Sequence, residues 1–242
     1  NAGIFVATSA GNAGPDLESL NSPGDAPWMT TVGASSHNRV YKTSLPADDG
    51  VTAPIVINGQ SMAGGLPTPA EIVFAADYTA GGTIDPDDAR LCADGVFPAG
   101  TFSGEIVVCE RGTYGRVAKG QTVLDGGAGG YILAQPTEFY GGPGSVAQDS
   151  HVLPSVHIDY YAYQNLLAYM AAAPGPVMGT ISDVSWDNSA QDGDIMASFS
   201  SRGPNGSTKL LDIVKPNVTA PGRAIWAAYH QGAGGDGDYT YN

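Results

Sequence analysis

Two short polar runs near the ends of the chain limit what it can fold into more than any other feature. The first, Ser9-Ala10-Gly11-Asn12-Ala13-Gly14-Pro15, follows an apolar stretch, Ile4–Thr8, that we expect to be a buried strand. The second is Ser198-Phe199-Ser200-Ser201-Arg202-Gly203-Pro204. An asparagine among glycines directly after a strand is most often a turn residue. Its side-chain N–H2 group can also stabilise an oxygen that becomes negative during acyl transfer, and the local sequence leaves both interpretations open.

The composition indicates a folded protein with many turns and short strands. Of the 242 residues, 42% are hydrophobic and 14% are charged, which is enough apolar material for a packed core. The 34 glycines and 17 prolines favour turns over long helices. A net charge of −14 with only ten basic residues argues against nucleic acid or an anionic membrane as a partner. The chain also lacks an apolar run of the roughly 18 residues that a membrane span needs.

Hydrophobic periodicity divides the chain into three parts. Buried strands are predicted at 4–8 and 29–34, which suits a parallel sheet covered on both faces. From about residue 45 the pattern loosens, and the middle part follows. Its predicted elements are strands at 51–58, 71–75, 104–109, 130–134 and 177–181, and helices at 115–125 and 159–172, the last capped by Asp159. A strand at 195–199, an extended segment at 214–222 and an exposed glycine-rich loop at 232–237 complete the prediction.

Four segments resemble, in the same order, signature segments of the subtilisin-like serine proteases. They are Val6–Pro15, Asn21–Ser35, Ala197–Pro204 and Lys215–Gly222. The resemblance implies an α/β fold with a parallel-sheet catalytic domain, and hydrolysis of peptide bonds in protein or peptide substrates through an acyl-enzyme. It also implies that Asn12 donates to the oxyanion hole. Ser9, Ala10 and Gly11 would line one wall of the pocket for the side chain that precedes the scissile bond.

The middle of the chain resembles a protease-associated domain, a mostly β (α+β) insert of many secreted subtilisin-like proteases. The segments that carry this resemblance are Gly104–Cys109, Glu110-Arg111-Gly112, Lys119, Gly126–Leu133 and Leu153–Val156. We therefore expect a catalytic-domain part at 1–48, the insert at 49–182 and a second catalytic-domain part at 183–242. The resemblance implies secretion, no required cofactor, and a role of the insert in substrate access or in self-association as a homodimer.

The two cysteines, Cys92 and Cys109, do not form a C-x-x-C metal-binding pair. Considered alone, they could be a disulfide or two buried free thiols. The resemblance to protease-associated domains of plant-type enzymes implies the disulfide.

The nucleophile and base of the family do not match any residue of this chain. None of the four histidines (His37, His151, His157, His230) stands before Gly-Thr. Ser61 lies in a Gly-Gln-Ser-Met-Ala run that imitates the serine motif, but Gly64-Gly65-Leu66-Pro67 would break the helix that should follow it. We expect the catalytic Asp and His to precede Asn1, the serine to follow Asn242, and this chain alone to be inactive. The alternative is a non-catalytic peptide-binding or dimerisation module.

Three smaller features complete the expectations. Asp85-Pro86-Asp87-Asp88 could contact Ca²⁺, although its spacing fits a solvated acidic turn better. Arg111 and Arg116 are expected to be surface charges. A metallo-aminopeptidase with the same kind of insert would need a cluster of zinc ligands, and none flanks the insert, so we predict no metal site.

Overall fold

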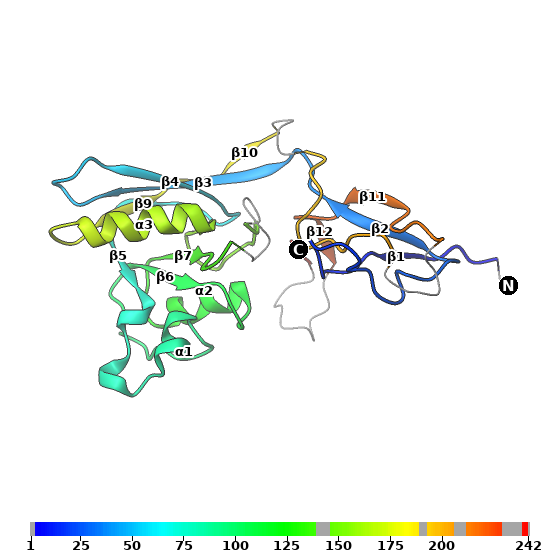
Figure 1. Cartoon of the computed structure of the whole chain (residues 1–242). Helices are drawn as coiled ribbons and strands as arrows, with labels where there is room; N and C mark the ends of the chain where they lie inside the picture. The colour runs from blue at the N-terminus through cyan, green and yellow to red at the C-terminus, as the bar shows by residue number, and fades with distance from the viewer. Residues whose placement is uncertain (1–2, 139–145, 189–192, 206–211, 229–238, 242) are drawn as a thin grey trace. The chain divides into compact units, whose positions relative to one another are not determined.

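A computed structural model describes residues 3–138, 146–188, 193–205, 212–228 and 239–241. Contacts divide the chain into two compact units. The first unit consists of Asn1–Val40 and Asn188–Ile225 with Asn242, and the second of Tyr41–Asp187 and Trp226–Tyr241 (Figure 1). Among the residues described, no helix has the length and apolar character required to cross a bilayer.

The second unit is built around a sheet that closes on itself. Seven strands follow one another around it in the order β3 (Val40–Asp48), β4 (Ile55–Gln60), β8 (Ser155–Ile158), β7 (Gly130–Ala134), β6 (Ile106–Glu110), β5 (Leu66–Phe74) and β9 (Met178–Ile181), and β9 pairs with β3. The short strand β10 (Ser185–Asp187) is attached to β3. Neighbours from β5 to β8 are parallel and the other pairs of the ring are antiparallel. Closure satisfies the backbone groups that an open sheet would leave at its edges.

The elements with the strongest local signals are those that the sequence predicted best. β6, helix α2 (Arg116–Asp125) and β7 form a strand–helix–strand unit with parallel strands, as expected. Helix α3 (Tyr160–Ala172) begins after Asp159, whose Oδ1 accepts a hydrogen bond from Ala162 N at 2.8 Å. The middle part is mostly β, in agreement with the predicted class of the insert.

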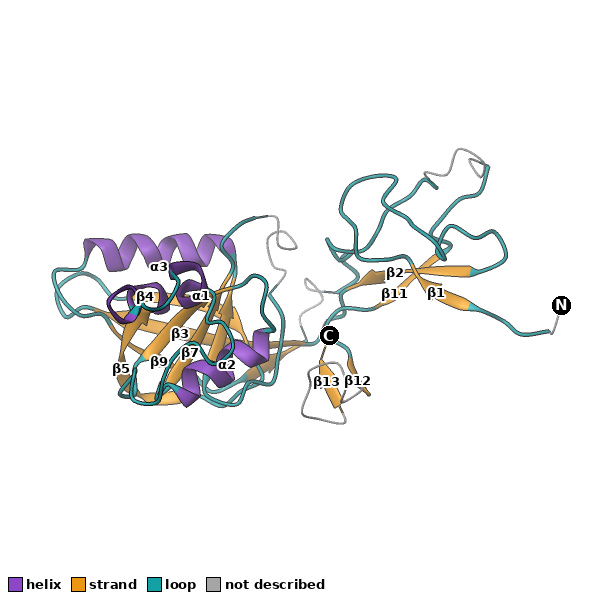
Figure 2. Ribbon diagram, turned by 90° about the horizontal axis from the view of Figure 1, so that it is seen from below, coloured by secondary structure: helices purple, strands orange, loops and turns teal. Residues whose placement is uncertain are grey.

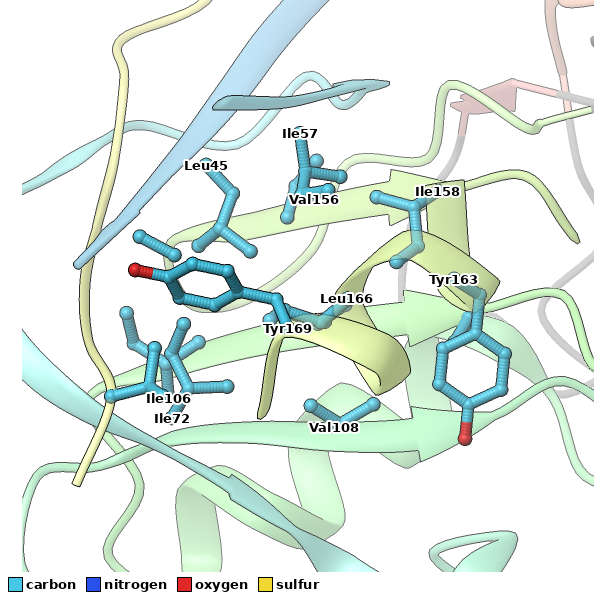
Figure 3. Close-up of a cluster of buried hydrophobic side chains, with 14 of the residues drawn as sticks. Leu45, Ile57, Ile72, Ile106, Val108, Val156, Ile158, Tyr163, Leu166 and Tyr169 are labelled. Atoms are coloured by element: carbon cyan, nitrogen blue, oxygen red, sulfur yellow. The ribbon is translucent and has the colours of Figure 1, made fainter. Parts of the chain in front are cut away.

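Two apolar clusters lie on opposite faces of the central strands. Ile106 and Val108 of β6 pack toward α3, whereas Val107 of the same strand packs toward Val123 of α2. Figure 3 shows the first cluster, in which Leu166 and Tyr169 of α3 meet side chains of the strands. In Figure 1 helix α3 lies above strands β6 and β7, and helices α1 and α2 lie below them; Figure 2 shows the same helices and strands from below. Strands covered on both faces require continuous apolar runs, which is what β6 and β7 provide.

A short helix and a disulfide cover the second cluster. Helix α1 (Pro86–Arg90) follows two 3₁₀ turns, η1 (Ala75–Asp77) and η2 (Ala80–Gly82). The Oδ1 atom of Asp85 accepts from the backbone N of Asp87 at 2.9 Å and of Asp88 at 3.4 Å, so the acidic run forms the beginning of this helix. Cys92, just after α1, is bonded to Cys109 of β6, with their Cα atoms 5.8 Å apart.

The first unit contains a parallel sheet of three strands in the order β1 (Ala7–Ser9), β2 (Thr30–Ser35) and β11 (Val218–Pro221). The prediction of a buried strand at 4–8 was wrong: only Ala7 and Thr8 of this range belong to β1, and neither is buried. Ile4, Phe5 and Val6 precede β1 and are 75%, 78% and 42% exposed, because no described element packs over them.

Two further predictions were wrong. Residues 195–199 do not form a strand: Met196 makes a single bridge to Ser35, and the backbone then turns, with Ser200 N donating to Ala197 O at 3.1 Å. Strand β3 was not predicted at all, although Leu45 and Ala47 on it are buried in the first cluster. Strands β12 (Trp226–Ala228) and β13 (Tyr239–Tyr241) pair antiparallel in the second unit. The predicted loop at 232–237 lies outside the described residues.

Candidate functional site

Asn12 lies on an exposed turn that follows the end of β1. The backbone N of Ala10, which is buried, donates to Val32 O of β2 at 2.9 Å and holds the beginning of the turn. Gly11 then adopts a φ of +103°, a left-handed conformation that strongly favours glycine. Within the described part of the chain, no residue forms a hydrogen bond with the Asn12 amide. The amide is therefore accessible to a ligand from solvent.

Ser201, in the second polar run, holds this turn through two hydrogen bonds. Ser201 Oγ accepts a hydrogen bond from Ala13 N at 3.0 Å, and Ser201 N donates to Gly11 O at 2.9 Å. Gly11 and Ala13, the two residues that flank Asn12, are thus both bonded to Ser201, which lies 188 positions after Ala13 in the sequence. Ser201 is only 1% exposed. The structure brings together the two runs that stood out in the sequence.

Further contacts join the same two segments. Gly14 N donates to Phe199 O at 2.9 Å, and a Cβ atom at Gly14 would lie only 2.2 Å from Ser200 O. The backbones meet so closely that only glycine fits at this position. Ser200 Oγ accepts from Ala34 N of β2 at 3.0 Å, which fixes the second run to the sheet.

A buried lysine joins β2 to the segment that leads into β11. Lys215 is 3% exposed, and its Nζ donates to Met29 O at 2.6 Å, Thr31 Oγ1 at 3.1 Å and Asn217 Oδ1 at 2.9 Å. Asn217 Oδ1 also accepts from Thr31 N at 2.8 Å. The sequence drew attention to this segment but did not indicate that its lysine is buried.

The three predicted wall residues differ in how they are presented. Ser9 and Gly11 are exposed, whereas the side chain of Ala10 is only 3% exposed. A ligand beside this segment would contact the backbone at Ala10 and not its methyl group. Their role in a pocket stays a prediction.

Ser61, the serine in the imitation motif, is part of the barrel interior. It is 1% exposed, its Oγ lies 2.8 Å from Ser155 Oγ, and Ala63 N donates to it at 3.0 Å. A hydroxyl group held in this way packs the barrel and is closed to substrates.

A second polar cluster lies within the barrel unit, and here the expectation that Arg116 is a surface charge was wrong. Arg116 Nε lies 2.5 Å from Asp149 Oδ2, and Nη2 lies 2.8 Å from Oδ1, a bidentate pair. Burial opposes ionisation of Asp149, but the hydrogen bonds and charge of Arg116 outweigh it and hold its pKa below the usual range. A buried carboxylate needs a cation beside it, which explains why this arginine turns inward.

Two buried histidines lie near this ion pair. Burial lowers the pKa of His151 to about 4 and that of His157 well below its ordinary value. His157 Nδ1 accepts from Ala147 N at 2.9 Å, and the ring of His151 packs edge-on against Tyr131, with 5.0 Å between the ring centroids. Both histidines are therefore neutral near pH 7 and serve the packing of the barrel.

Lys119 is a third buried ionisable group of the barrel unit. It is fully buried, its Nζ donates to Leu91 O, and it lies 5.3 Å from the centroid of the Tyr114 ring. Burial, assisted by the nearby charge of Arg90, lowers the pKa of Lys119 to about 8. Among the described residues no cluster of three His, Cys, Asp or Glu side chains could hold a metal ion.

Comparison with known sequences shows what this chain is similar to. The PA domain model matches residues 51–166. The subtilisin-like protease SBT5.4 of Arabidopsis thaliana is 35% identical over 235 residues, which cover 96% of this chain and 28% of that protein. SBT1.6 of the same plant is also 35% identical, over 240 residues that cover 97% of this chain and 29% of that protein. The chain is related to the plant subtilisin-like proteases and contains a PA domain.

The similarity to subtilisin-like proteases spans both structural units, because it covers nearly the whole chain. The chain nevertheless spans less than a third of the length of these relatives. Solved structures resemble the chain only weakly. A zinc aminopeptidase from Bacillus subtilis matches with a TM-score of 0.37 and 13% identity, over 66% of this chain and 34% of that one. The psychrophilic subtilisin-like protease Apa1 from Pseudoalteromonas sp. AS-11 matches with a TM-score of 0.31, over 79% of this chain and 51% of that one.

Proposed function

We propose that this chain is part of a secreted subtilisin-like serine endopeptidase and that it supplies one wall of the oxyanion hole. When a nucleophile attacks a peptide carbonyl, the carbonyl oxygen becomes negatively charged. The Asn12 N–H2 group would donate to this oxygen. The donor stabilises the transition state more than the ground state, and it therefore accelerates the chemical step. The observation that carries the proposal is an exposed Asn12 amide on a turn whose two flanking residues are fixed by Ser201.

Under this proposal the covalent chemistry belongs to residues outside the chain. The chain has no histidine before Gly-Thr, and Ser61 is buried in the barrel. An oxyanion donor without nucleophile and base has no covalent step to assist. The chain alone would therefore be inactive, and the longer protein would cleave protein or peptide substrates.

The proposed domain plan assigns 1–48 and 183–242 to the catalytic domain and 49–182 to the PA insert. The parallel sheet β1-β2-β11 would be part of a larger subtilisin-like parallel sheet, with Ser9, Ala10 and Gly11 beside the substrate. The Cys92–Cys109 disulfide supports secretion, because such bonds persist in oxidising compartments.

The PA domain would control access of the substrate or hold two copies together as a homodimer. Apolar side chains on its outer surface support the second role: Val56 of β4 is 60% exposed and Met178 of β9 is 40% exposed, on the two strands that flank β3. We expect Val56→Lys to shift the protein from dimer to monomer in sedimentation equilibrium. A wild-type protein that is monomeric throughout the accessible concentration range would contradict self-association.

The oxyanion role is tested by Asn12→Ala in the longer protein. We expect kcat to fall by about 10²–10³-fold with KM little changed, a size known for the corresponding donor in subtilisin. Asn21→Ala is the matched control, because Asn21 is another exposed asparagine of the same segment; among the described residues its side chain donates only to Ser19 O, at 3.4 Å. Equal kcat values for both variants would exclude the oxyanion role. A longer protein without peptidase activity would favour the alternative, a non-catalytic peptide-binding or dimerisation module.

A further inference from the structure

We propose that Ser201 is a positioning residue for the oxyanion hole: it sets the direction of the Asn12 amide without touching the substrate. This inference rests on the proposed oxyanion role of Asn12. Its carrying observation is that Ser201 bonds to the residue before Asn12 and to the residue after it.

The two bonds act on different atoms of the turn. Ser201 N donates to Gly11 O at 2.9 Å, which fixes the peptide that enters Asn12. Ser201 Oγ accepts from Ala13 N at 3.0 Å, which fixes the peptide that leaves it. With both peptides held, the Cα–Cβ bond of Asn12 has one direction, and the amide needs to order only its own side-chain torsions.

The Ser201 hydroxyl group also leaves no room for a side chain at Gly11. A Cβ atom at Gly11 would lie 2.9 Å from Ser201 Oγ, closer than real Cβ contacts occur. The φ of +103° at Gly11 also disfavours any other residue. The close approach of the Ser201 hydroxyl group and the backbone conformation of the turn thus both require glycine at position 11.

Ser201 can act as a fixed point because its own neighbours are anchored. Ser200 Oγ accepts from Ala34 N of β2 at 3.0 Å, and Arg202 N donates to Ser19 Oγ at 2.8 Å. With 1% exposure, Ser201 has no room to leave the turn. An ordered donor loses less entropy when the oxyanion forms, and small misplacement of a catalytic group is costly in rate.

The test compares Ser201→Ala with Ser200→Ala in the longer protein. Both serines are 1% exposed and each accepts one bond from a backbone N–H at 3.0 Å, but only Ser201 bonds to the turn of Asn12. We expect Ser201→Ala to lower kcat about tenfold or more with KM nearly unchanged. Ser200→Ala should lower kcat clearly less than Ser201→Ala does, because it removes one anchor of the segment but leaves both bonds from Ser201 to the turn in place.

A double-mutant cycle separates positioning from general damage. In the Asn12→Ala background, Ser201→Ala should lower kcat less than about twofold, because no amide remains to be positioned. If Ser201→Ala costs the same factor in both backgrounds, Ser201 acts on packing and the inference is overturned. If Asn12→Ala lowers kcat while Ser201→Ala does not, the oxyanion role stands and the positioning role fails. If Asn12→Ala has no effect, both fail.

Ser201→Cys keeps the test available should Ser201→Ala fold poorly. A thiol has nearly the volume of the hydroxyl group but is a weak acceptor. We expect this variant to lose kcat in the same way while its unfolding temperature stays close to that of the wild-type protein. Wild-type kcat in a well-folded Ser201→Cys variant would overturn the inference.

Discussion

The barrel unit and the three-stranded unit are held together by different forces. In the barrel, the fully buried side chains are mainly aliphatic and aromatic, and the ring of strands closes on itself. Among the described residues of the three-stranded unit the four most deeply buried side chains are polar, Thr31, Ser200, Ser201 and Asn205, and Lys215 is as buried as Ala10. Buried apolar area gives the barrel its stability without specifying fine geometry, whereas directional hydrogen bonds specify geometry at Asn12 and add less stability.

This difference fits the two proposed roles. An accessory domain needs a stable shape, and a closed ring of strands with two apolar clusters provides one. An oxyanion donor needs a defined direction, and bonds from a segment 188 residues away provide it. The apolar side chains that the first unit leaves exposed, such as Ile4 and Phe5, show that area burial is not what holds its turn in place.

The strongest test of the apolar barrel is Leu166→Ala in α3. Leu166 is fully buried in the first cluster, and its truncation should lower the free energy of unfolding by about 3–4 kcal/mol. Urea unfolding followed by the fluorescence of the barrel measures this change. Leu124→Ala on α2 is the control, since Leu124 is 37% exposed and should cost less than about 1 kcal/mol. Similar values for the two variants would show that the barrel does not depend on its core.

The disulfide should be the next largest contribution to the same unit. Cys92 and Cys109 are 17 residues apart, and a loop of this size predicts about 3 kcal/mol in the chain-entropy account. A Cys92→Ser/Cys109→Ser double variant should lower the unfolding temperature of the barrel, as should a reducing agent acting on the wild-type protein. A reducing agent should leave the double variant unchanged. Unaltered barrel stability in both experiments would contradict this assignment.

Acid should weaken the barrel through its neutral histidines. The pKa of His151 is about 4 in the folded protein and about 6.5 when unfolded, so the unfolded chain binds more protons between these values. The contribution of neutral His151 to the free energy of unfolding is fully present above about pH 6.5. It falls as the pH drops toward 4, by about 2 kcal/mol between pH 7 and pH 5. Asp149, Arg116 and Tyr131 face this histidine.

Urea unfolding at several pH values measures the acid effect, and His151→Leu should reduce the slope between pH 7 and pH 5 without abolishing it. His157 adds a loss of the same sign, because its pKa is also lowered by burial. An unchanged slope in His151→Leu would show that another group titrates.

Lys215→Met tests the polar interior of the three-stranded unit and should have the smallest effect on global stability. The substitution leaves Met29 O, Thr31 Oγ1 and Asn217 Oδ1 without the lysine donor, at a cost of about 2 kcal/mol confined to this unit. Amide exchange at Thr31 and Asn217 should accelerate by about 30-fold while the barrel amides keep their rates. Lys42→Met, which removes an exposed lysine paired with Asp187, should change exchange little. Faster exchange in the barrel as well would contradict the division of forces.

The sequence predicted the elements whose signals are local. Helix α3 was found because Asp159 caps it and its apolar residues repeat at helical spacing, and β7 because it is a short uninterrupted apolar run. Strand β3 was missed because its three buried apolar residues, Val40, Leu45 and Ala47, are separated by polar residues and by Pro46. A strand at 195–199 was predicted wrongly because the segment pairs with the end of β2 through a single bridge, from Met196 to Ser35, and the backbone then turns between Ala197 and Ser200.

The same distinction applies to the site. Asn12 could be proposed from its neighbours in the sequence and from the family resemblance. Ser201 could not, because its bonds join residues that only the folded chain brings together. The inward turn of Arg116 was equally hidden, since it depends on the buried carboxylate of Asp149.

The central claim is that the segment around Ser201 fixes the turn of Asn12, and amide hydrogen exchange at Ala13 tests it most directly. Ala13 is exposed, but its N–H is bonded to a serine that is 1% exposed. We predict that Ala13 N–H exchanges at least about 100-fold more slowly than the exposed amide of Phe5, and that Ser201→Ala abolishes this protection. Exchange at Ala13 as fast as at Phe5 in the wild-type protein would show that the turn is not held, and would contradict the account.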